Sequence, residues 1–297
     1  MKDQADRLRK LMRGKTNDKK GEPGKDYAKV LAITSGKGGV GKTNFAINLG
    51  ISLRRLGYSV LIFDADIGLA NIEIIAGTSI KYTIADLFVN NKDIYEIIGE
   101  GPEGIKIISG GSGFNELSMM NDENICKLLK EIEKLESSMD FIIIDTGAGV
   151  SNIVLDFIMT ADEVIVITTP DPTSLMDSYT VIKALTINGY KGKLNVVTNI
   201  VNNGIEAMGI YNKLNRASNN FLNIELNFLG YLEKSNIVTN AVKNQQPFLL
   251  SNPSSTISKR INIMASSFVD PCNLNAIKQE SSFTQKLKNL FFGRGVS

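Results

Sequence analysis

The feature that most constrains this chain is an eight-residue glycine-rich segment, GKGGVGKT, at residues 36–43. It directly follows an apolar run, Val30–Thr34, that is typical of a buried strand, and it precedes a helix-like stretch from Thr43 to about Leu56. Glycines at these spacings let successive backbone N–H groups turn inward around phosphate oxygens. The following helix would point its positive N-terminal end at the same anion. The chain is therefore expected to bind a phosphate-bearing ligand.

Strand-like runs alternate with helix-like stretches along the middle of the chain, which indicates repeated βα units. Continuous apolar strands joined by helices predict an α/β fold, with one doubly wound, mostly parallel sheet covered on both faces. Ligands of such sheets bind beyond the carboxyl ends of the strands. The expected strands are Val30–Thr34, Val60–Asp64, Ile105–Ile108, Phe141–Asp145, Glu163–Thr168, Leu194–Thr198 and Phe228–Leu232, and the expected helices include Thr43–Leu56, Ile125–Leu135 and Ser174–Ile187.

The full motif between a strand and a helix favours a nucleotide site over a glycine-rich turn that binds nothing. Lys42 can reach the β- and γ-phosphates of a nucleotide, and the Thr43 hydroxyl can bind Mg²⁺. The expected phosphate-binding residues are Gly36, Lys37, Gly38, Gly39, Val40, Gly41, Lys42 and Thr43.

Composition excludes several other classes of function. The chain has no histidine, which rules out His-based acid–base chemistry, and its net charge of +2 gives no global field that would attract nucleic acid. Cys126 and Cys272 form no metal-spaced cluster and are typical of free thiols in a reducing compartment. No apolar run approaches the ~18 residues that span a bilayer. A cytoplasmic protein, with peripheral membrane contact at most, is expected.

Lys37 is a second lysine inside the glycine-rich segment, and the reading KGGVGKT resembles the MinD/ParA family of P-loop ATPases. The alternative is a solvated loop charge. In that family the extra lysine crosses a dimer interface and contacts the nucleotide of the partner subunit. The resemblance therefore implies an ATP-dependent homodimer in which Lys37 and Lys42 act on the reacting phosphates. A cation supplied in trans makes hydrolysis depend on dimerisation.

Two strand-end segments resemble the switch regions of the same family. The first, Phe63–Asn71, has Asp66 where the family orients the attacking water, with Asp64 and Asn71 supporting the site. The second, Asp145–Gly149, has Asp145 near Mg²⁺. The resemblance thus implies Asp66 as a catalytic residue and Thr43, Asp64 and Asp145 as the residues that hold the metal. A strand-end carboxylate that only caps a neighbouring helix is the alternative for each.

The resemblance also implies where the base binds. Asn199 follows a strand at the position where the family hydrogen-bonds adenine, and Pro170 and Asp171 follow another strand and are expected to flank the base. An ordinary turn residue is the alternative for Asn199. Glu233 stands where the family usually has proline, so the backbone there is expected to differ.

The N-terminal zone, residues 1–26, begins with a charged DQADRLR element that resembles the DQAxxLR leader of the FlhG family (also called FleN or YlxH). That family regulates flagellar number and placement, and its leader stimulates the partner GTPase FlhF. The implied partners are an FlhF-like GTPase and flagellar C-ring proteins. A leader that merely solubilises the chain is the alternative. The expected partner-binding residues are Asp3, Gln4, Ala5, Leu8 and Arg9.

The C-terminal zone, residues 269–297, follows the ATPase domain at 27–268 and carries one amphipathic helix. Its apolar residues recur at helical spacing, with Lys286, Lys288 and Arg294 outside the apolar face. Such a helix suits the surface of an anionic membrane. The alternative is a helix docked on the protein's own body, and both states can alternate between monomer and ATP-bound dimer. The expected membrane-facing residues are Phe283, Leu287, Leu290, Phe291 and Phe292.

The resemblance implies a slow ATPase that switches between a monomer and a membrane-associating dimer and regulates flagella. A MinD-type regulator of the division site is an alternative within the family, although it lacks the DQAxxLR leader. A ParA-type partition protein that holds DNA without sequence specificity is an alternative of another class. An iron–sulfur carrier would need paired cysteines near the dimer axis, which the spacing of Cys126 and Cys272 does not give.

Overall fold

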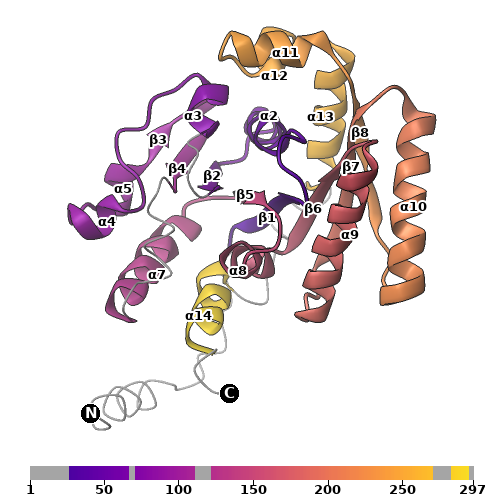
Figure 1. Cartoon of the computed structure of the whole chain (residues 1–297). Coiled ribbons are helices and arrows are strands. Elements are labelled where there is room, and N and C mark those ends of the chain that lie inside the picture. Colours follow the sequence, from indigo (N-terminus) through magenta and orange to yellow (C-terminus); the bar gives the residue numbers. More distant parts are fainter. Residues whose placement is uncertain (1–26, 67–70, 111–121, 270–281, 294–297) are drawn as a thin grey trace.

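A computed structural model describes residues 27–66, 71–110, 122–269 and 282–293. Its centre is an eight-stranded sheet with the strand order β3-β4-β2-β5-β1-β6-β7-β8 (Figure 1). All neighbouring strands pair in parallel except β3, which is antiparallel to β4 at one edge. The strands are β1 Lys29–Ser35, β2 Val60–Ala65, β3 Gly99–Glu100, β4 Lys106–Ser109, β5 Phe141–Ala148, β6 Glu163–Thr168, β7 Lys193–Val201 and β8 Asn227–Glu233.

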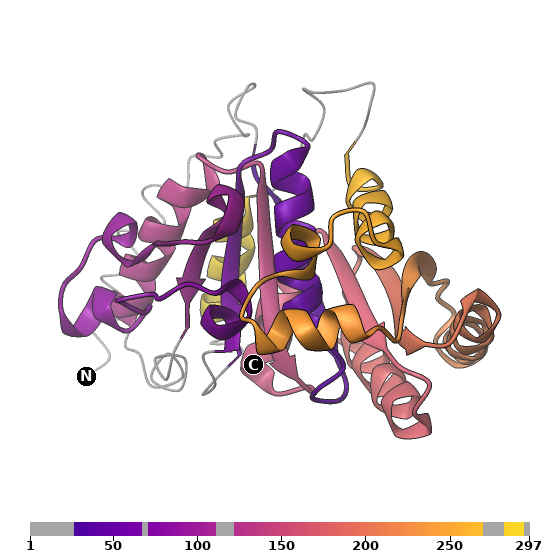
Figure 2. The same cartoon turned by 90° about the horizontal axis from the view of Figure 1, so that it is seen from above.

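Helices cover both faces of this sheet, because the strand side chains are apolar on both sides. Figure 2 looks onto the face that is packed by α2 Lys42–Arg55, α3 Asn71–Ala76, α11 Asn236–Lys243, α12 Phe248–Ser251 and α13 Thr256–Ser266. The opposite face is packed by α4 Asp86–Val89, α5 Ile94–Ile97, α7 Asp122–Glu136, α8 Asn152–Thr160, α9 Pro172–Ile187, α10 Gly204–Leu222 and α14 Phe283–Gly293. A short 3₁₀ turn, Pro102–Gly104, precedes β4.

The pairing register brings the ends of β1, β2 and β5 together at the carboxyl edge of the sheet. Asp145 on β5 is the register partner of both Asp64 on β2 and Ile33 on β1. Any ligand held by the loop after β1 therefore lies beside two strand-end carboxylates. This placement follows from the parallel topology and needs no long loop.

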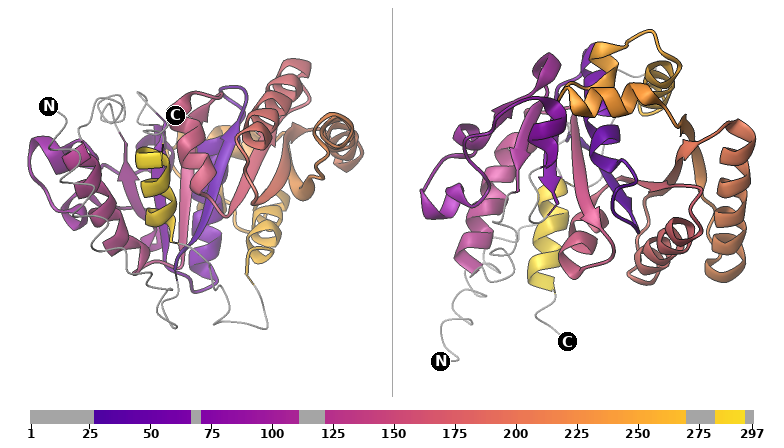
Figure 3. Two further views of the ribbon diagram at one scale, coloured as in Figure 1. Left: turned by 90° about the horizontal axis from the view of Figure 1, so that it is seen from below. Right: turned by 45° about the horizontal axis from the view of Figure 1, so that its top comes forward.

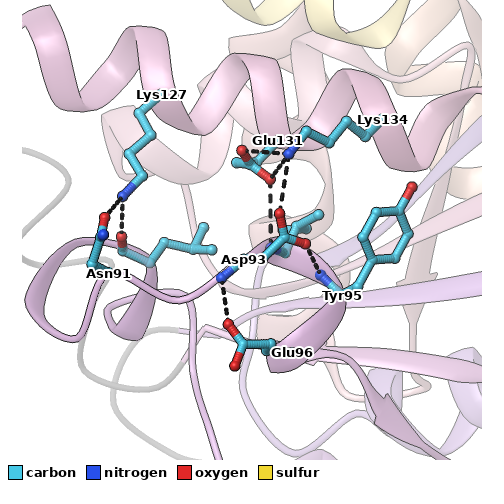
Figure 4. A network of polar contacts seen from close by, with 9 residues as sticks. Asn91, Asp93, Tyr95, Glu96, Lys127, Glu131 and Lys134 are labelled. Carbon is cyan, nitrogen blue, oxygen red and sulfur yellow. Dashed lines mark hydrogen bonds and ion pairs between the residues drawn. The ribbon is translucent and has the colours of Figure 1, made fainter.

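Helix α7 is fixed to the α4–α5 segment by a polar network (Figure 4). Lys127 donates to the carbonyl of Leu87 at 2.7 Å and to Asn91 Oδ1 at 2.6 Å. Lys134 pairs with Asp93 at 3.1 Å, and Asp93 also caps the N-terminus of α5. Each exposed contact is weak alone, but together they join α7 to the sheet edge.

Helix α14 lies against α7 and α8 on the same face (Figures 1 and 3). Its first turn contains the buried side chains of Phe283 and Leu287, which belong to the core of that face. The C-terminal amphipathic helix is thus docked on the body of the protein in this structure.

The expected fold class is confirmed, and each expected strand and helix is present. The observed bounds differ from the expected ones by three residues at most. The expected strand Leu194–Thr198, for example, is β7, which extends to Val201. The edge strand β3 was not expected, since two residues leave no pattern in the sequence. The leader at residues 1–26 lies outside the described residues.

Candidate nucleotide-binding site

The glycine-rich segment forms the turn between β1 and the N-terminus of α2, as the motif predicts. Gly39 has a φ of 75° and Gly41 a φ of 94°, both in the left-handed region that favours glycine. A β-carbon at Gly36 would lie 2.1 Å from the carbonyl carbon of Asp177 in α9. These positions therefore need glycine to form the turn and to let it approach α9.

Lys42 is buried beneath this loop, and its Nζ donates to Ser35 Oγ at 3.1 Å. Burial lowers the pKa of Lys42, while the nearby carboxylates of Asp145 and Asp66 raise it. Ser35 Oγ in turn donates to the carbonyl of Lys37 at 2.7 Å. Ser35 was missed in the sequence because its role depends on this contact and not on the motif.

Asp64 and Asp145 are neighbouring, buried carboxylates at the ends of β2 and β5. Burial raises the pKa of Asp64 to about 8 and that of Asp145 to about 7, and the charge of Asp145 adds to the shift of Asp64. Thr43 and Lys42 lower the pKa of Asp145 in part. Neither oxygen of Asp145 makes a hydrogen bond of good geometry to any residue that the structure describes.

These carboxylates fit a divalent cation. Buried carboxylates normally have partners, and oxygen ligands are what Mg²⁺ prefers. Within the described ranges no group of three or more His, Cys, Asp or Glu side chains could form a complete metal cage. A Mg²⁺ ion bound with phosphates usually takes only one or two protein carboxylates, so Asp145, Asp64 and the Thr43 hydroxyl are a sufficient set.

The two predicted switch segments meet at Asp66. Its backbone N–H donates to Asp64 Oδ1 at 3.0 Å. A β-carbon at Gly147 in the second segment would lie 2.9 Å from Asp66 Oδ1. The carboxylate that is expected to orient water therefore lies beside the last residues of β5. Residues 67–70 and the side chain of Asn71 lie outside the described part.

Asn199 lies at the wall of a cavity of about 270 Å³ next to the glycine-rich turn. Its Nδ2 donates to the carbonyl of Val40 at 2.7 Å, and its Oδ1 accepts from the backbone N–H of Ile200 at 2.9 Å. Ile200 has a φ of 60°, a region that β-branched residues rarely enter. The cavity is lined by Gly39, Gly41, Asn44, Phe45, Asn199, Ile200, Leu232, Glu233, Lys234, Ser235, Val238, Thr239, Phe248 and Ile257.

This cavity is large enough to receive a purine base, and Asn199 and Gly41 join it to the phosphate loop. Asn44, Ile200 and Ser235 were not expected as lining residues, because they come from three separate segments that meet only in the folded chain. Glu233 forms an ion pair with Arg260 at 3.1 Å, and Arg260 also lies over the ring of Tyr231.

Pro170 and Asp171 line a second cavity of about 430 Å³ together with Lys37, and this cavity adjoins the first at Gly39, Ile200 and Lys234. Lys37 Nζ is 2.6 Å from Asp171 Oδ2 and 2.8 Å from Thr173 Oγ1. The structure thus brings Asn199 to the first cavity, but not Pro170 and Asp171. They lie together with Lys37 on the outer side of the loop.

The C-terminal helix is held by a buried glutamate on α7. Glu136 accepts hydrogen bonds from Ser282 Oγ at 2.6 Å, from the N–H of Phe283 at 2.6 Å, and from the N–H and Oγ1 of Thr284 at 3.2 and 2.9 Å. Lys286 forms an ion pair with Asp162.

Other predicted residues at the two ends are not described. The side chains of Leu290, Phe291 and Phe292 lie outside the described residues, as do Asp3, Gln4, Ala5, Leu8 and Arg9. Among the helices that are described, none is both long and apolar enough to cross a bilayer.

Comparison with known proteins places this site in a family. A ParA family model, described as NUBPL iron-transfer P-loop NTPase, matches residues 26–269. The flagellum site-determining protein YlxH of Helicobacter pylori is 36% identical over 279 residues, which are 94% of this chain and 94% of YlxH. The antiactivator FleN of Pseudomonas aeruginosa is 31% identical over 229 residues, which are 77% of this chain and 82% of FleN.

Solved structures agree with this assignment. The MinC:MinD cell division protein complex of Aquifex aeolicus contains a chain with a TM-score of 0.66 and 25% identity, and the match covers 81% of this chain and 95% of that one. MinD of Pyrococcus horikoshii, solved with Mg-ADP, has the same fold with a TM-score of 0.66 at 21% identity, over 84% of this chain and 99% of that one. The chain therefore belongs to the ParA/MinD family of P-loop ATPases, in the group that contains YlxH and FleN.

Proposed function

We propose that this protein is an ATP-hydrolysing switch that regulates the number and placement of flagella. The observation that carries the proposal is the buried carboxylate of Asp145: neither oxygen makes a hydrogen bond of good geometry to the described residues, although Thr43 and Lys42 lie close enough to lower its pKa. A buried carboxylate without a partner is costly unless a cation binds it. The names of the relatives, a flagellum site-determining protein and an antiactivator, supply the biological setting.

Hydrolysis then depends on groups at the carboxyl edge of the sheet. The backbone N–H groups of residues 36–43 and the amine of Lys42 bind the phosphates. Thr43, Asp64 and Asp145 would hold Mg²⁺, which when bound would neutralise charge on the phosphates. Asp66 orients the attacking water, because its carboxylate lies next to Gly147 of the second switch segment. The cavity beside Asn199 receives adenine.

Lys37 supports a dimer in which each subunit contacts the nucleotide of the other. The cavity that contains Lys37 is open to solvent and includes Ile200, which is 41% exposed. The first turns of α10 add Ile205 at 87% and Met208 at 40% exposure, on either side of Glu206, which lines the same cavity. A second copy that approaches Lys37 would cover these apolar side chains.

Membrane association depends on α14. In the docked state Phe283 and Leu287 are buried and Lys286 is paired, so this part of the helix offers no surface to a bilayer. Release would require the Glu136 contacts to break. We assign release to the ATP-bound dimer, because α8 begins four residues after the second switch loop reaches Ala148 and packs against α14.

The hydrolytic assignment is tested with Asp66→Ala. This variant should bind ATP but not turn it over, and it should accumulate as a dimer that light scattering detects. Turnover at the wild-type rate would contradict the role of Asp66. Glu100→Gln, an exposed acid on the edge strand β3, is the matched control for the loss of one charge.

The flagellar assignment is tested with a variant that lacks the residues before Gly14. The intact chain should bind an FlhF-like GTPase and raise its turnover, and the shortened chain should do neither while it still hydrolyses ATP. Equal stimulation by both chains would remove the leader from the proposal. Binding to C-ring proteins is measured in the same pull-down.

A further inference from the structure

Lys37 is held within its own subunit by two residues at the start of α9. The Nζ–Oδ2 distance to Asp171 is 2.6 Å, and the distance to Thr173 Oγ1 is 2.8 Å. Both side chains of the ion pair are 43% exposed, so water and a second subunit can reach them. The amine that is proposed to act in trans is therefore engaged in cis in this structure.

Asp171 divides its two carboxylate oxygens between two tasks. Oδ1 caps helix α9 by accepting from the N–H and the hydroxyl of Thr173, both at 2.9 Å. Oδ2 faces Lys37 alone. The hydrogen bond from Lys37, followed by those from Thr173, lowers the pKa of Asp171 to about 2. The capping task and the pairing task can therefore be separated by substitution.

The glycine-rich loop and α9 are in close contact next to Lys37. Gly36 directly precedes Lys37, and its α-carbon approaches the backbone of Asp177 so closely that no β-carbon fits. The P-loop is thus packed against the first two turns of α9. Rotation of the Lys37 side chain, which is 43% exposed, is enough to separate the amine from Asp171 without movement of the backbone.

We propose that Asp171 is a positioning residue that retains Lys37 in cis and so weakens ATP-dependent dimerisation. This inference rests on the proposed function, in which Lys37 contacts the nucleotide of the partner. Each subunit must give up its Lys37–Asp171 pair before the dimer forms. The carboxylate and the partner's phosphates compete for one amine, and this competition favours the monomer until ATP is bound.

The expected effect is moderate because the pair is exposed. An exposed ion pair of this kind changes an equilibrium by up to about fivefold. Two pairs break in each dimer, and the two effects multiply if they are independent. Removing the carboxylate charge should therefore strengthen dimerisation by up to about 25-fold.

The test compares variants in the full-length chain with Asp66→Ala present in each, so that ATP is not consumed. Sedimentation equilibrium at saturating Mg-ATP gives the dimer dissociation constant, and a fluorescent ADP analogue gives the nucleotide affinity of the monomer. Asp171→Asn retains an oxygen that can cap α9, because Asn is as good an N-cap as Asp, but it loses the charge that faces Lys37. Glu206→Gln removes a charge from the same cavity without removing a contact to Lys37.

Asp171→Asn should lower the dimer dissociation constant between about 3- and 25-fold. The affinity of its monomer for the ADP analogue should stay within about twofold of the parent. Glu206→Gln should leave both constants at the parent values. The gain should vanish when Lys37→Ala is added. An unchanged or weaker dimer in Asp171→Asn would overturn the inference, as would a gain that persists without Lys37 or is matched by Glu206→Gln. If Lys37→Ala alone dimerises like the parent, the trans role of Lys37 fails instead.

Discussion

Two buried acids at opposite ends of β5 have opposite environments. Glu136, five residues before β5, accepts four hydrogen bonds from residues 282–284. Asp145, near the end of β5, makes none of good geometry to the described residues. Both side chains are about 1% exposed. Burial alone therefore does not reveal the role of a carboxylate. Glu136 completes the fold, whereas Asp145 is available for a ligand.

The largest effect is expected from Glu136→Ala. This change leaves four donors at the start of α14 without their acceptor, which should cost about 3 kcal/mol of docking free energy. Amide hydrogen exchange at 283–293 should rise strongly, and binding to anionic liposomes should no longer need ATP. Glu133→Gln, an exposed acid on the same helix, is the control. Unchanged exchange in Glu136→Ala would show that the apolar contacts of Phe283 and Leu287 alone hold the helix.

Asp145→Asn is expected to stabilise the protein, whereas Glu136→Ala destabilises the docking of α14. Without Mg²⁺ and nucleotide, this variant should be more stable than the wild type by about 1–3 kcal/mol, because the cost of burying the Asp145 charge exceeds the opposing effects of Thr43 and Lys42. The pKa of Asp145 in the folded state is raised from 3.8 to about 7. The free energy of unfolding of the wild type should therefore fall as the pH rises from 3.8 to about 7, and it should remain low at higher pH.

Urea unfolding at pH 5 and pH 8 measures both effects of Asp145→Asn. The advantage of the variant should be largest at pH 8 and smaller at pH 5. Mg-ADP should stabilise the wild type more than the variant, which reverses the order. A variant that is less stable than the wild type at pH 8 would mean that Asp145 already has a partner in the free protein.

The smallest effect is expected from Lys286→Gln. Its ion pair with Asp162 is partly exposed and should contribute less than about 1 kcal/mol. Hydrogen exchange in α14 should rise only a few-fold, and high salt should remove the difference from the wild type. Lys288→Gln, which changes an exposed lysine two residues away, should leave the exchange rate unchanged. If Lys286→Gln raised hydrogen exchange as much as Glu136→Ala does, the ion pair with Asp162 would be the main contact that holds the helix.

The sequence predicts those parts of the molecule whose cause is local. The apolar runs predict the parallel sheet, and the motif at residues 36–43 predicts a turn that only glycine allows at Gly41. Glu136 could not be found in this way, because its donors lie about 146 residues further along the chain. The helical spacing of Phe283 and Leu287 was read correctly, yet a spacing does not say whether protein or membrane covers the apolar face.

The same limit applies at the two cavities. Pro170 and Asp171 follow β6, and Asn199 lies near the end of β7, so all three were expected around one base. Asp171 caps α9 and turns its second oxygen to Lys37, and the sequence shows neither contact. Lys286 was expected outside the apolar face, free to meet a membrane, but Asp162 lies within reach of it only in the folded chain.

Hydrogen exchange of Asp66→Ala, with and without Mg-ATP, tests the central claim most directly because it reports both ends of the sheet in one sample. Mg-ATP is expected to slow exchange at residues 36–43 and around Asp145. In the same sample, exchange at 283–293 should become faster, since the dimer releases α14. Light scattering shows whether the same sample is dimeric. If a dimeric sample exchanges more slowly at the P-loop but α14 stays equally protected or becomes more protected, nucleotide binding and helix release do not belong to one switch.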